Sequence, residues 1–263
     1  MKLGRVKHKS LLKPRFARIE SDRVYPLEEG KWFDDANFLA HARSLPLAEV
    51  DLIAPVVPSK IVCVGRNYLE HAVELGNKMP DEPLLFLKAP SAVIGSGERI
   101  VLPPQSQQVE HEGELGVVIA KHARNLSDDH DPLTYVLGYT CVNDVTARDL
   151  QRKDVQFTRA KSFDTFCPVG PWIITDLNPV NTSVTTRVNG EVKQQGHTSE
   201  MAFAVPFLIK YISGIMTLNP GDLIVTGTPA GVSRLQPGDI VEVEVEGVGL
   251  LSNPVYEPAR NKR

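Results

Sequence analysis

Three glutamates at alternate positions are the residues of this chain best placed to do chemistry. Glu110, Glu112 and Glu114 directly precede the apolar run 115–120. Because every second side chain of a β-strand lies on one face, all three carboxylates are expected to point the same way. Like charges this close raise each other's proton affinity, and a bound divalent cation removes the repulsion. Oxygen ligands suit Mg²⁺, Mn²⁺ or Ca²⁺, although the spacing alone leaves an acidic, solvent-facing edge strand as an equal alternative.

A further carboxylate stands where another apolar segment ends. Asp144 follows the predicted strand 136–143, at the point where polar residues begin. A short carboxylate in that position would close a metal site begun by the glutamates. Asp149 is interpreted as structural, either paired with Arg148 or capping a helix.

His71 and Glu74 form a candidate general base. They are three residues apart on a helix predicted over 67–76, so both side chains lie on one face. A carboxylate beside an imidazole fixes its tautomer and raises its basicity. The alternative is a surface ion pair, which is the commoner outcome for an isolated pair with this spacing.

Two later segments carry polar groups that fit the same chemistry. Lys161 would stabilise a developing enolate if it lay near a metal, and would otherwise be an ordinary surface lysine. The small-residue loop 225–232 follows an apolar strand and would bring the Thr228 hydroxyl and backbone N–H groups to a carboxylate. It lacks the basic residue of a phosphate-binding loop.

Composition excludes several classes of protein. The 263 residues are 42% hydrophobic and 23% charged, as in an ordinary globular protein. A net charge of −3 favours neither nucleic acid nor an anionic membrane as a partner. The sequence has no apolar run of about 18 residues to span a bilayer and no apolar signal-peptide stretch near its N-terminus. Three cysteines without C-x-x-C spacing indicate reduced, buried thiols in a cytoplasmic protein.

Short strands dominate the predicted elements. Strands over 2–7, 15–20 and 23–27 predict a small N-terminal β-rich domain over residues 1–57, with a helix over 35–43 and a proline-rich linker at 54–59. Further strands are expected over 60–65, 115–120 and 136–143, and a helix over 200–213. Asn189-Gly190 predicts a hairpin, and Pro-Gly-Asp turns at 220–222 and 237–239 each begin an apolar strand. This pattern predicts a mainly β fold with some α, as a sandwich, roll or barrel.

The chain resembles the fumarylacetoacetate hydrolase superfamily over about residues 58–256. Five motifs follow one another in the family's order: V-G-R-N-Y-x-x-H, E-x-E-L-G-V-V-I, N-D-V-T-A-R-D, A-K-S-F-D and G-D-L-I-V-T-G-T-P-A-G-V. The resemblance implies a mixed β-roll or barrel as the catalytic domain of residues 58–256, and a homodimer. The residues beyond it, 257–263, are predicted to be a frayed tail.

The resemblance also implies a role for each residue of the site. Glu112, Glu114 and Asp144 would hold Mg²⁺ or Mn²⁺, which leaves Glu110 outside the trio. The resemblance implies that His71 and Glu74 activate water and that Lys161 lies near the substrate's keto oxygen. It implies that Gln151 contacts the substrate and that Thr228 binds the substrate's carboxylate. Arg66 is expected near the pocket.

The implied activity is metal-dependent chemistry on 2-oxo or 2-hydroxydienoic acids and diacids through a stabilised enolate. The sequence favours C–C bond hydrolysis of an acylpyruvate or decarboxylation of oxaloacetate, because the His71–Glu74 pair is suited to activating water. Isomerisation of 2-hydroxyhepta-2,4-diene-1,7-dioate is the alternative, and a non-catalytic scaffold is a remote one. The substrate is expected to be a small molecule rather than a nucleic acid or a membrane.

Overall fold

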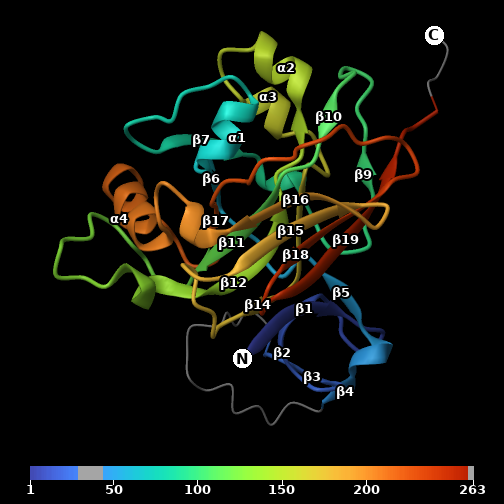
Figure 1. Ribbon diagram of the computed structural model, residues 1–263. Coiled ribbons are helices and arrows are strands. Elements are labelled where there is room, and N and C mark those ends of the chain that lie inside the picture. Colours follow the sequence, from blue (N-terminus) through green and yellow to red (C-terminus); the bar gives the residue numbers. More distant parts are fainter. Residues whose placement is uncertain (29–43, 260–263) are drawn as a thin grey trace.

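The computed structural model describes residues 1–28 and 44–259, and these residues fold mainly as β-strands (Figure 1). Within them lie a twelve-stranded sheet, a five-stranded sheet and a two-stranded ladder. The mainly β class is confirmed, and the described sheets do not close into a barrel. The helix predicted over 35–43 falls outside the described residues, as does the end of the predicted tail. No helix among the described residues is long and apolar enough to cross a membrane.

The large sheet carries the strands that position the site. Its main path runs through β4 (Leu45–Pro46), β3 (Arg23–Pro26), β2 (Arg15–Glu20), β1 (Lys2–Lys7), β14 (Cys167–Ile174), β12 (Val136–Asn143), β11 (Gly113–Ile119), β17 (Leu223–Val225), β6 (Ile61–Gly65) and β7 (Leu84–Lys88). Two short strands join its sides, β5 (Asp51–Ile53) at β1 and β8 (Val93–Ile94) at β14.

The second sheet packs against this one and supplies part of the site's support. Its order is β16 (Glu191–His197), β15 (Ser183–Val188), β18 (Ile240–Val245), β19 (Gly249–Tyr256) and β9 (Ile100–Val101), and the separate ladder joins β10 (Val109–Glu110) to β13 (Thr146–Ala147). Four α-helices are described: α1 (Leu69–Glu74), α2 (Arg148–Lys153), α3 (Thr158–Lys161) and α4 (Val205–Ile215).

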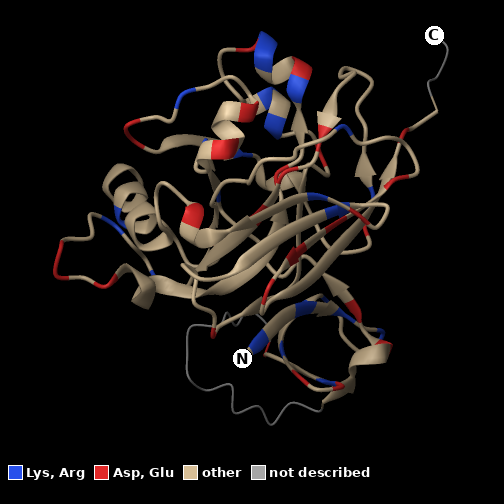
Figure 2. Ribbon diagram, in the orientation of Figure 1, with Lys and Arg blue, Asp and Glu red and all other residues tan. Residues whose placement is uncertain are grey.

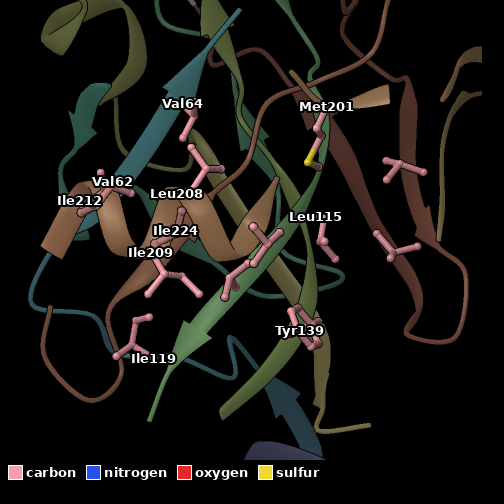
Figure 3. Packing of buried hydrophobic residues seen from close by; sticks show 14 of the residues in the cluster. Val62, Val64, Leu115, Ile119, Tyr139, Met201, Leu208, Ile209, Ile212 and Ile224 are labelled. Atoms are coloured by element: carbon pink, nitrogen blue, oxygen red, sulfur yellow. The ribbon is translucent and has the colours of Figure 1, made fainter. Parts of the chain in front are cut away.

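The main core lies between α4, the large sheet and the inner face of the second sheet. Leu208, Ile209 and Ile212 of α4 belong to the same buried cluster as Leu115 of β11 and Ile224 of β17 (Figure 3). Burying one such side chain stabilises the fold by about 1.5–3 kcal/mol. The apolar half of β11 is therefore fixed firmly, and its polar N-terminal end is held in register at the site.

Several sequence predictions are confirmed in detail. Asn189 and Gly190 both have positive φ, 53° and 80°, and join β15 to β16 as the hairpin prediction requires. The two Pro-Gly-Asp turns precede β17 and β18. The helix predicted from residue 200 instead begins at Val205, because Pro206 occupies the first turn, where a missing N–H costs nothing.

The N-terminal strands do not form a sheet of their own. β1 pairs in antiparallel register with β14, Lys2 opposite Ile174, so that β1 to β4 extend the large sheet. The strands predicted over 2–7 and 15–20 are thus present as β1 and β2, within the large sheet, and the domain boundary at residue 57 stays a prediction. An unpaired β1 or β14 edge would leave a row of backbone polar groups without partners, and their pairing satisfies both edges.

Candidate metal centre

Glu112, Glu114 and Asp144 come together at one end of the β11–β12 ladder. One carboxylate oxygen from each lies within 4.8 Å of the other two, and all three residues are buried. The ladder sets this geometry, since the Asp144 amide donates to the Glu112 carbonyl at 2.8 Å and the Glu112 amide donates to the Asn143 side chain at 3.0 Å. The cluster therefore rests on the strand ends of the sheet rather than on a mobile loop.

Glu110 lies outside the cluster formed by the other two glutamates and Asp144. It lies in β10, and the chain leaves regular strand structure at His111 and Glu112 before β11 begins. Its carboxylate accepts a hydrogen bond from Arg148 Nε at 2.7 Å. The expectation of one uninterrupted strand carrying all three glutamates is wrong, because β10 ends at Glu110 and β11 begins only at Gly113; Glu110 and Glu112 instead share the Arg148 guanidinium.

Three buried cations surround the trio. Lys161 Nζ bridges Glu112 and Asp144, at 2.7 and 2.6 Å from their oxygens. Lys88 Nζ lies 2.6 Å from the other Asp144 oxygen, and Arg148 binds the second Glu112 oxygen through Nη2. Glu112 and Asp144 thus have charged partners on both oxygens.

Glu114 is the carboxylate without such a partner. The described residues form no ion pair with it, and its Oε2 accepts a hydrogen bond from the Gly227 amide. Burial, Asp144 and Glu112 together raise the pKa of Glu114 well above its ordinary value. Burial acts in the same direction on Glu112, but Lys161 and Arg148 outweigh it and hold the pKa of Glu112 far below its usual range.

This donor set fits a hard divalent cation. It offers three carboxylates and no sulfur or imidazole within the cluster, as Mg²⁺ and Mn²⁺ prefer. Glu114 would gain from a cation the counter-charge that the described side chains do not give it. The arrangement therefore supports Glu112, Glu114 and Asp144 as a metal site.

A cavity of about 280 Å³ opens over the trio. Besides the three carboxylates, it is lined by five of the other residues singled out in the sequence: Arg66, His71, Gln151, Lys161 and Thr228. Glu74 does not line it. A cavity this small suits a substrate of a few carbons rather than a drug-sized ligand.

His71 faces the cavity from α1, with Glu74 behind it. His71 is buried, and its Nδ1 lies 3.2 Å from Glu74 Oε2. The carboxylate acts as acceptor, so Nδ1 carries the proton and Nε2 is left to the cavity. The other Glu74 oxygen accepts a hydrogen bond from the Gly231 amide at 3.0 Å, which holds the pair in place.

Arg66 enters the cavity from a constrained turn. Its φ is +56°, which is uncommon for a residue other than glycine. The next residue anchors the turn, since the Asn67 side chain donates to the Thr226 carbonyl at 2.7 Å and accepts from the Phe203 amide at 2.8 Å. The backbone geometry that aims Arg66 is therefore held by buried hydrogen bonds.

The loop 226–231 joins the metal centre to the His71–Glu74 pair. The amides of Gly227 and Gly231 contact Glu114 and Glu74, and the Thr228 hydroxyl donates to the Gly113 carbonyl at 2.9 Å. Gly231 has a φ of +103°, and a Cβ there would lie 1.9 Å from the Lys193 carbonyl oxygen. Only glycine fits this position.

Gly231→Ala should therefore destabilise the protein by about 2–4 kcal/mol, through steric overlap as well as backbone strain. Gly238→Ala is the matched control, since its φ is +91° but a Cβ there meets nothing within 4 Å. The control should lose only about 1–2 kcal/mol from the left-handed backbone. Denaturant unfolding of both variants measures the difference, and equal losses would contradict the packing described for Gly231.

Sequence reasoning missed several residues of the site. Lys88 is fully enclosed on β7, and Arg148 pairs with Glu110 and Glu112 rather than with Asp149. Asp149 accepts hydrogen bonds from Ser106 Oγ and the Leu150 amide, so its structural interpretation agrees with its contacts.

A signal for part of this set was present in the sequence. Arg148, Gln151 and Arg152 occupy positions i, i+3 and i+4 and share one face of α2. All three line the cavity, and Arg148 Nη1 donates to Gln151 Oε1 at 2.6 Å. Lys and Arg residues gather on α2 and α3 next to this site (Figure 2).

Comparison with family models assigns this mainly β chain with its buried carboxylate trio to a known family. The family model for the fumarylacetoacetate (FAA) hydrolase C-terminal domain matches residues 60–256, and an Rv2993c-like N-terminal model matches residues 1–55. The chain belongs to the fumarylacetoacetate hydrolase family. Tautomerases, isomerases and hydrolases are among the members of this family.

Relatives and solved structures agree with this assignment. The chain is 49% identical over 246 residues to a protein of Archaeoglobus fulgidus, covering 93% of this chain and 97% of that one. It is 41% identical over 249 residues to oxaloacetate tautomerase YisK of Bacillus subtilis, covering 83% and 82%.

Among solved structures, 5-carboxymethyl-2-hydroxymuconate delta-isomerase from Mycobacterium smegmatis is similar, with a TM-score of 0.90 and 42% identity over 98% of this chain and 100% of that one. Maleylpyruvate hydrolase from Sphingobium, solved with manganese(II) and pyruvate, has a TM-score of 0.80 and 30% identity, covering 98% and 99%.

Proposed function

We propose that the protein is a divalent-metal-dependent enzyme that moves a proton at the carbon next to the keto group of a small 2-oxo acid. The observation that carries this proposal is the single cavity lined both by His71 and by the buried trio of Glu112, Glu114 and Asp144. The trio would hold Mg²⁺ or Mn²⁺, which when bound supplies Lewis-acid polarisation of the keto oxygen. The tautomerase and isomerase activities of similar proteins support the same choice.

The protein's own residues account for the proton movement. Conversion of an enol to its ketone moves one proton from the enol oxygen to carbon and changes no other connectivity. His71 Nε2 is the basic atom left to the cavity once Glu74 holds Nδ1. Lys161 also lines the cavity, and its ammonium group would stabilise negative charge that develops on the substrate oxygen.

C–C bond cleavage is the second candidate. The His71–Glu74 pair is equally able to take a proton from water, and a similar protein is a maleylpyruvate hydrolase. Cleavage was the sequence-based prediction. We rank proton transfer first because the identity to a tautomerase and an isomerase, 41% and 42%, exceeds the 37% to a fumarylacetoacetate hydrolase and the 30% to that maleylpyruvate hydrolase. The homodimer and the cytoplasmic location stay predictions.

Parallel assays on one enzyme preparation separate the two reactions. Purified protein with Mg²⁺ or Mn²⁺ is given enol-oxaloacetate, a hydroxyheptadienedioate and a series of acylpyruvates. Enol loss is followed by ultraviolet absorbance, and pyruvate release is followed by coupling to lactate dehydrogenase. Rapid enol conversion without pyruvate release supports proton transfer. Pyruvate release from an acylpyruvate, with no enol conversion above the spontaneous rate, would overturn it in favour of cleavage.

A substrate with a second carboxylate is expected, because the cavity wall carries two guanidinium groups that the trio does not engage. Arg66 and Arg152 both line the cavity, and Arg152 Nη2 contacts Gln108 Oε1 at 2.5 Å. Arg152→Gln should raise KM for a dicarboxylate about tenfold and leave KM for a monocarboxylic 2-oxo acid unchanged.

Lys153→Gln is the control for that prediction. It removes the same charge from the next position of α2, but Lys153 does not line the cavity. In this variant, the KM for the dicarboxylate divided by the KM for the monocarboxylate should equal the wild-type ratio. Equal shifts in both variants would indicate a general charge effect instead of a contact with substrate.

Metal affinity should fall as the pH is lowered. The raised pKa of Glu114 means that its proton must leave before its oxygen binds a cation, so affinity rises with pH until that group is ionised. Calorimetric titration with Mg²⁺ in two buffers of different ionisation enthalpy should show proton release. A Mg²⁺ affinity that stays constant as the pH is lowered would contradict the role given to Glu114.

A further inference from the structure

Gln194 is a buried amide at the junction of three parts of the site. It lies on β16 with 1% of its surface exposed. Its Oε1 accepts hydrogen bonds from the Gly113 amide and His111 Nδ1, each at 3.0 Å. Its Nε2 donates to Thr228 Oγ1 and to the Pro229 carbonyl, each at 2.7 Å. Both donors and both acceptor positions of the side chain are used.

A β-bulge aims this side chain at the site. Thr186 pairs with Gln194 and Arg187 pairs with Val192, so Lys193 is an extra residue in β16. Such a bulge bends the strand and redirects neighbouring side chains. The Gly231 position packs against the same bulge at the Lys193 carbonyl, so the loop 226–231 and Gln194 are placed by one local feature.

The amide of Gln194 has one possible orientation. The Gly113 contact is a backbone N–H, which only an oxygen can accept, and the Pro229 contact is a carbonyl, to which only an N–H can donate. Exchanging the amide oxygen and nitrogen would set donor against donor and acceptor against acceptor. Thr228 Oγ1 therefore faces an N–H group and must accept from it.

This fixes what Thr228 offers to a ligand. A threonine hydroxyl has one proton, and the Gln194 contact leaves that proton free of Gln194. That proton is donated to the Gly113 carbonyl at 2.9 Å, so a carboxylate bound beside Thr228, which lines the cavity, would take it over from Gly113. A carboxylate only accepts hydrogen bonds, so the hydroxyl is able to bind it only as a donor.

We infer that Gln194 is a positioning residue that commits the Thr228 hydroxyl to donate to the carboxylate of the 2-oxo acid. The inference rests on the proposed function, and adds to it the residue that sets the polarity of the carboxylate contact. Gln194 itself does not line the cavity, so it acts through Thr228 rather than by touching substrate.

The test is a double-mutant cycle in which Gln194→Glu and Thr228→Val are made singly and together. Gln194→Glu is nearly isosteric and keeps the oxygen that accepts from Gly113 and His111, but it replaces the donor that faces Thr228. The probe is oxalate, which mimics the enolate of pyruvate, and its dissociation constant is measured by calorimetry in saturating Mg²⁺. Mg²⁺ affinity is measured separately in each protein.

Gln194→Glu should weaken oxalate binding about 10–100-fold when Thr228 is present, as expected for loss of a hydrogen bond to a charged group. In the Thr228→Val background the same change should weaken it by about threefold or less, because no hydroxyl remains to be oriented. A general effect of the added carboxyl group acts in both backgrounds and cancels in the cycle. Thr228→Ser, which keeps the hydroxyl, should bind oxalate nearly as the wild type does.

Equal losses in both backgrounds would overturn the inference and leave Gln194 as a purely structural residue. If Gln194→Glu does not fold, Gln194→Met takes its place in the same cycle with the same expectations. Absence of oxalate binding by wild-type protein with Mg²⁺ or Mn²⁺ would overturn the proposed function as well. The two failures are distinguishable, because only the second removes binding from the unaltered protein.

Discussion

Glu114→Gln is expected to lower Mg²⁺ affinity by more than about 100-fold and to abolish metal-dependent turnover, while the protein stays folded. The magnitude exceeds the 10–100-fold typical of residues that only support a metal ligand. Glu114 is the trio member without an ion-pair partner among the described residues, so its charge is the one that a cation would neutralise. Calorimetric titration of the variant with Mg²⁺ measures the affinity.

The metal-free variant should also be more stable than the metal-free wild type at pH 7. Burial, Asp144 and Glu112 raise the pKa of Glu114 in the folded state, so ionisation opposes folding progressively as the pH rises above about 4.5. Glutamine cannot ionise, so the substitution removes this destabilisation of the folded state with little change in side-chain volume. Thermal unfolding in EDTA provides the comparison.

Glu110→Gln is the matched control, because it is the same substitution at the alternate position that the structure excludes from the trio. Glu110 contacts Arg148, which keeps Glu112 as a second partner. Mg²⁺ affinity should change far less than in Glu114→Gln. Wild-type Mg²⁺ affinity in Glu114→Gln, or its loss in Glu110→Gln alone, would show that the ligands are assigned wrongly.

His71→Ala is expected to lower kcat about 10²–10⁴-fold, the usual contribution of a positioned general base. His71 is buried, lines the cavity and is held by Glu74 at 3.2 Å. Its one side-chain hydrogen bond among the described residues is to Glu74, and it is not a member of the trio, so Mg²⁺ affinity should change little. Steady-state kinetics on enol-oxaloacetate together with Mg²⁺ titration tests both parts of the prediction.

Glu74→Gln serves as the graded control for the histidine. Its side chain still accepts a hydrogen bond from His71 but carries no charge, so kcat should fall by about 10-fold, less than in His71→Ala. Full turnover by His71→Ala would remove the histidine from the proton transfer. A simultaneous loss of Mg²⁺ affinity would mean that the substitution had disturbed the metal centre.

The sequence was most informative where chemistry and periodicity coincide. Asp144 at the end of a predicted strand, the Asn189-Gly190 hairpin and the Pro-Gly-Asp turns all depend on contacts between near neighbours along the chain. Glu112 and Glu114 were singled out because alternate positions share a strand face. The motif resemblance, and not the spacing, separated Glu110 from them.

What could not be predicted depends on long-range contacts. The pairing of β10 with β13 brings Glu110 opposite Thr146, which lies 36 residues further along the chain. Lys88 looks like an ordinary strand lysine until β7 is placed beside Asp144. The pairing of β1 with β14 joins segments from opposite sides of the linker at 54–59. Neither segment's own sequence indicates which distant strand it pairs with.

Restoring metal to stripped enzyme tests the central claim most directly. Protein treated with EDTA is titrated with Mn²⁺, and enol-oxaloacetate conversion and bound Mn²⁺ are measured at each addition, the latter by electron paramagnetic resonance. The account predicts that conversion is at the spontaneous rate without metal and rises in proportion to one tightly bound ion per chain, and that neither response occurs in Glu114→Gln. Conversion by metal-free enzyme at the rate of the loaded enzyme, or tight Mn²⁺ binding that leaves the conversion rate unchanged, would contradict it.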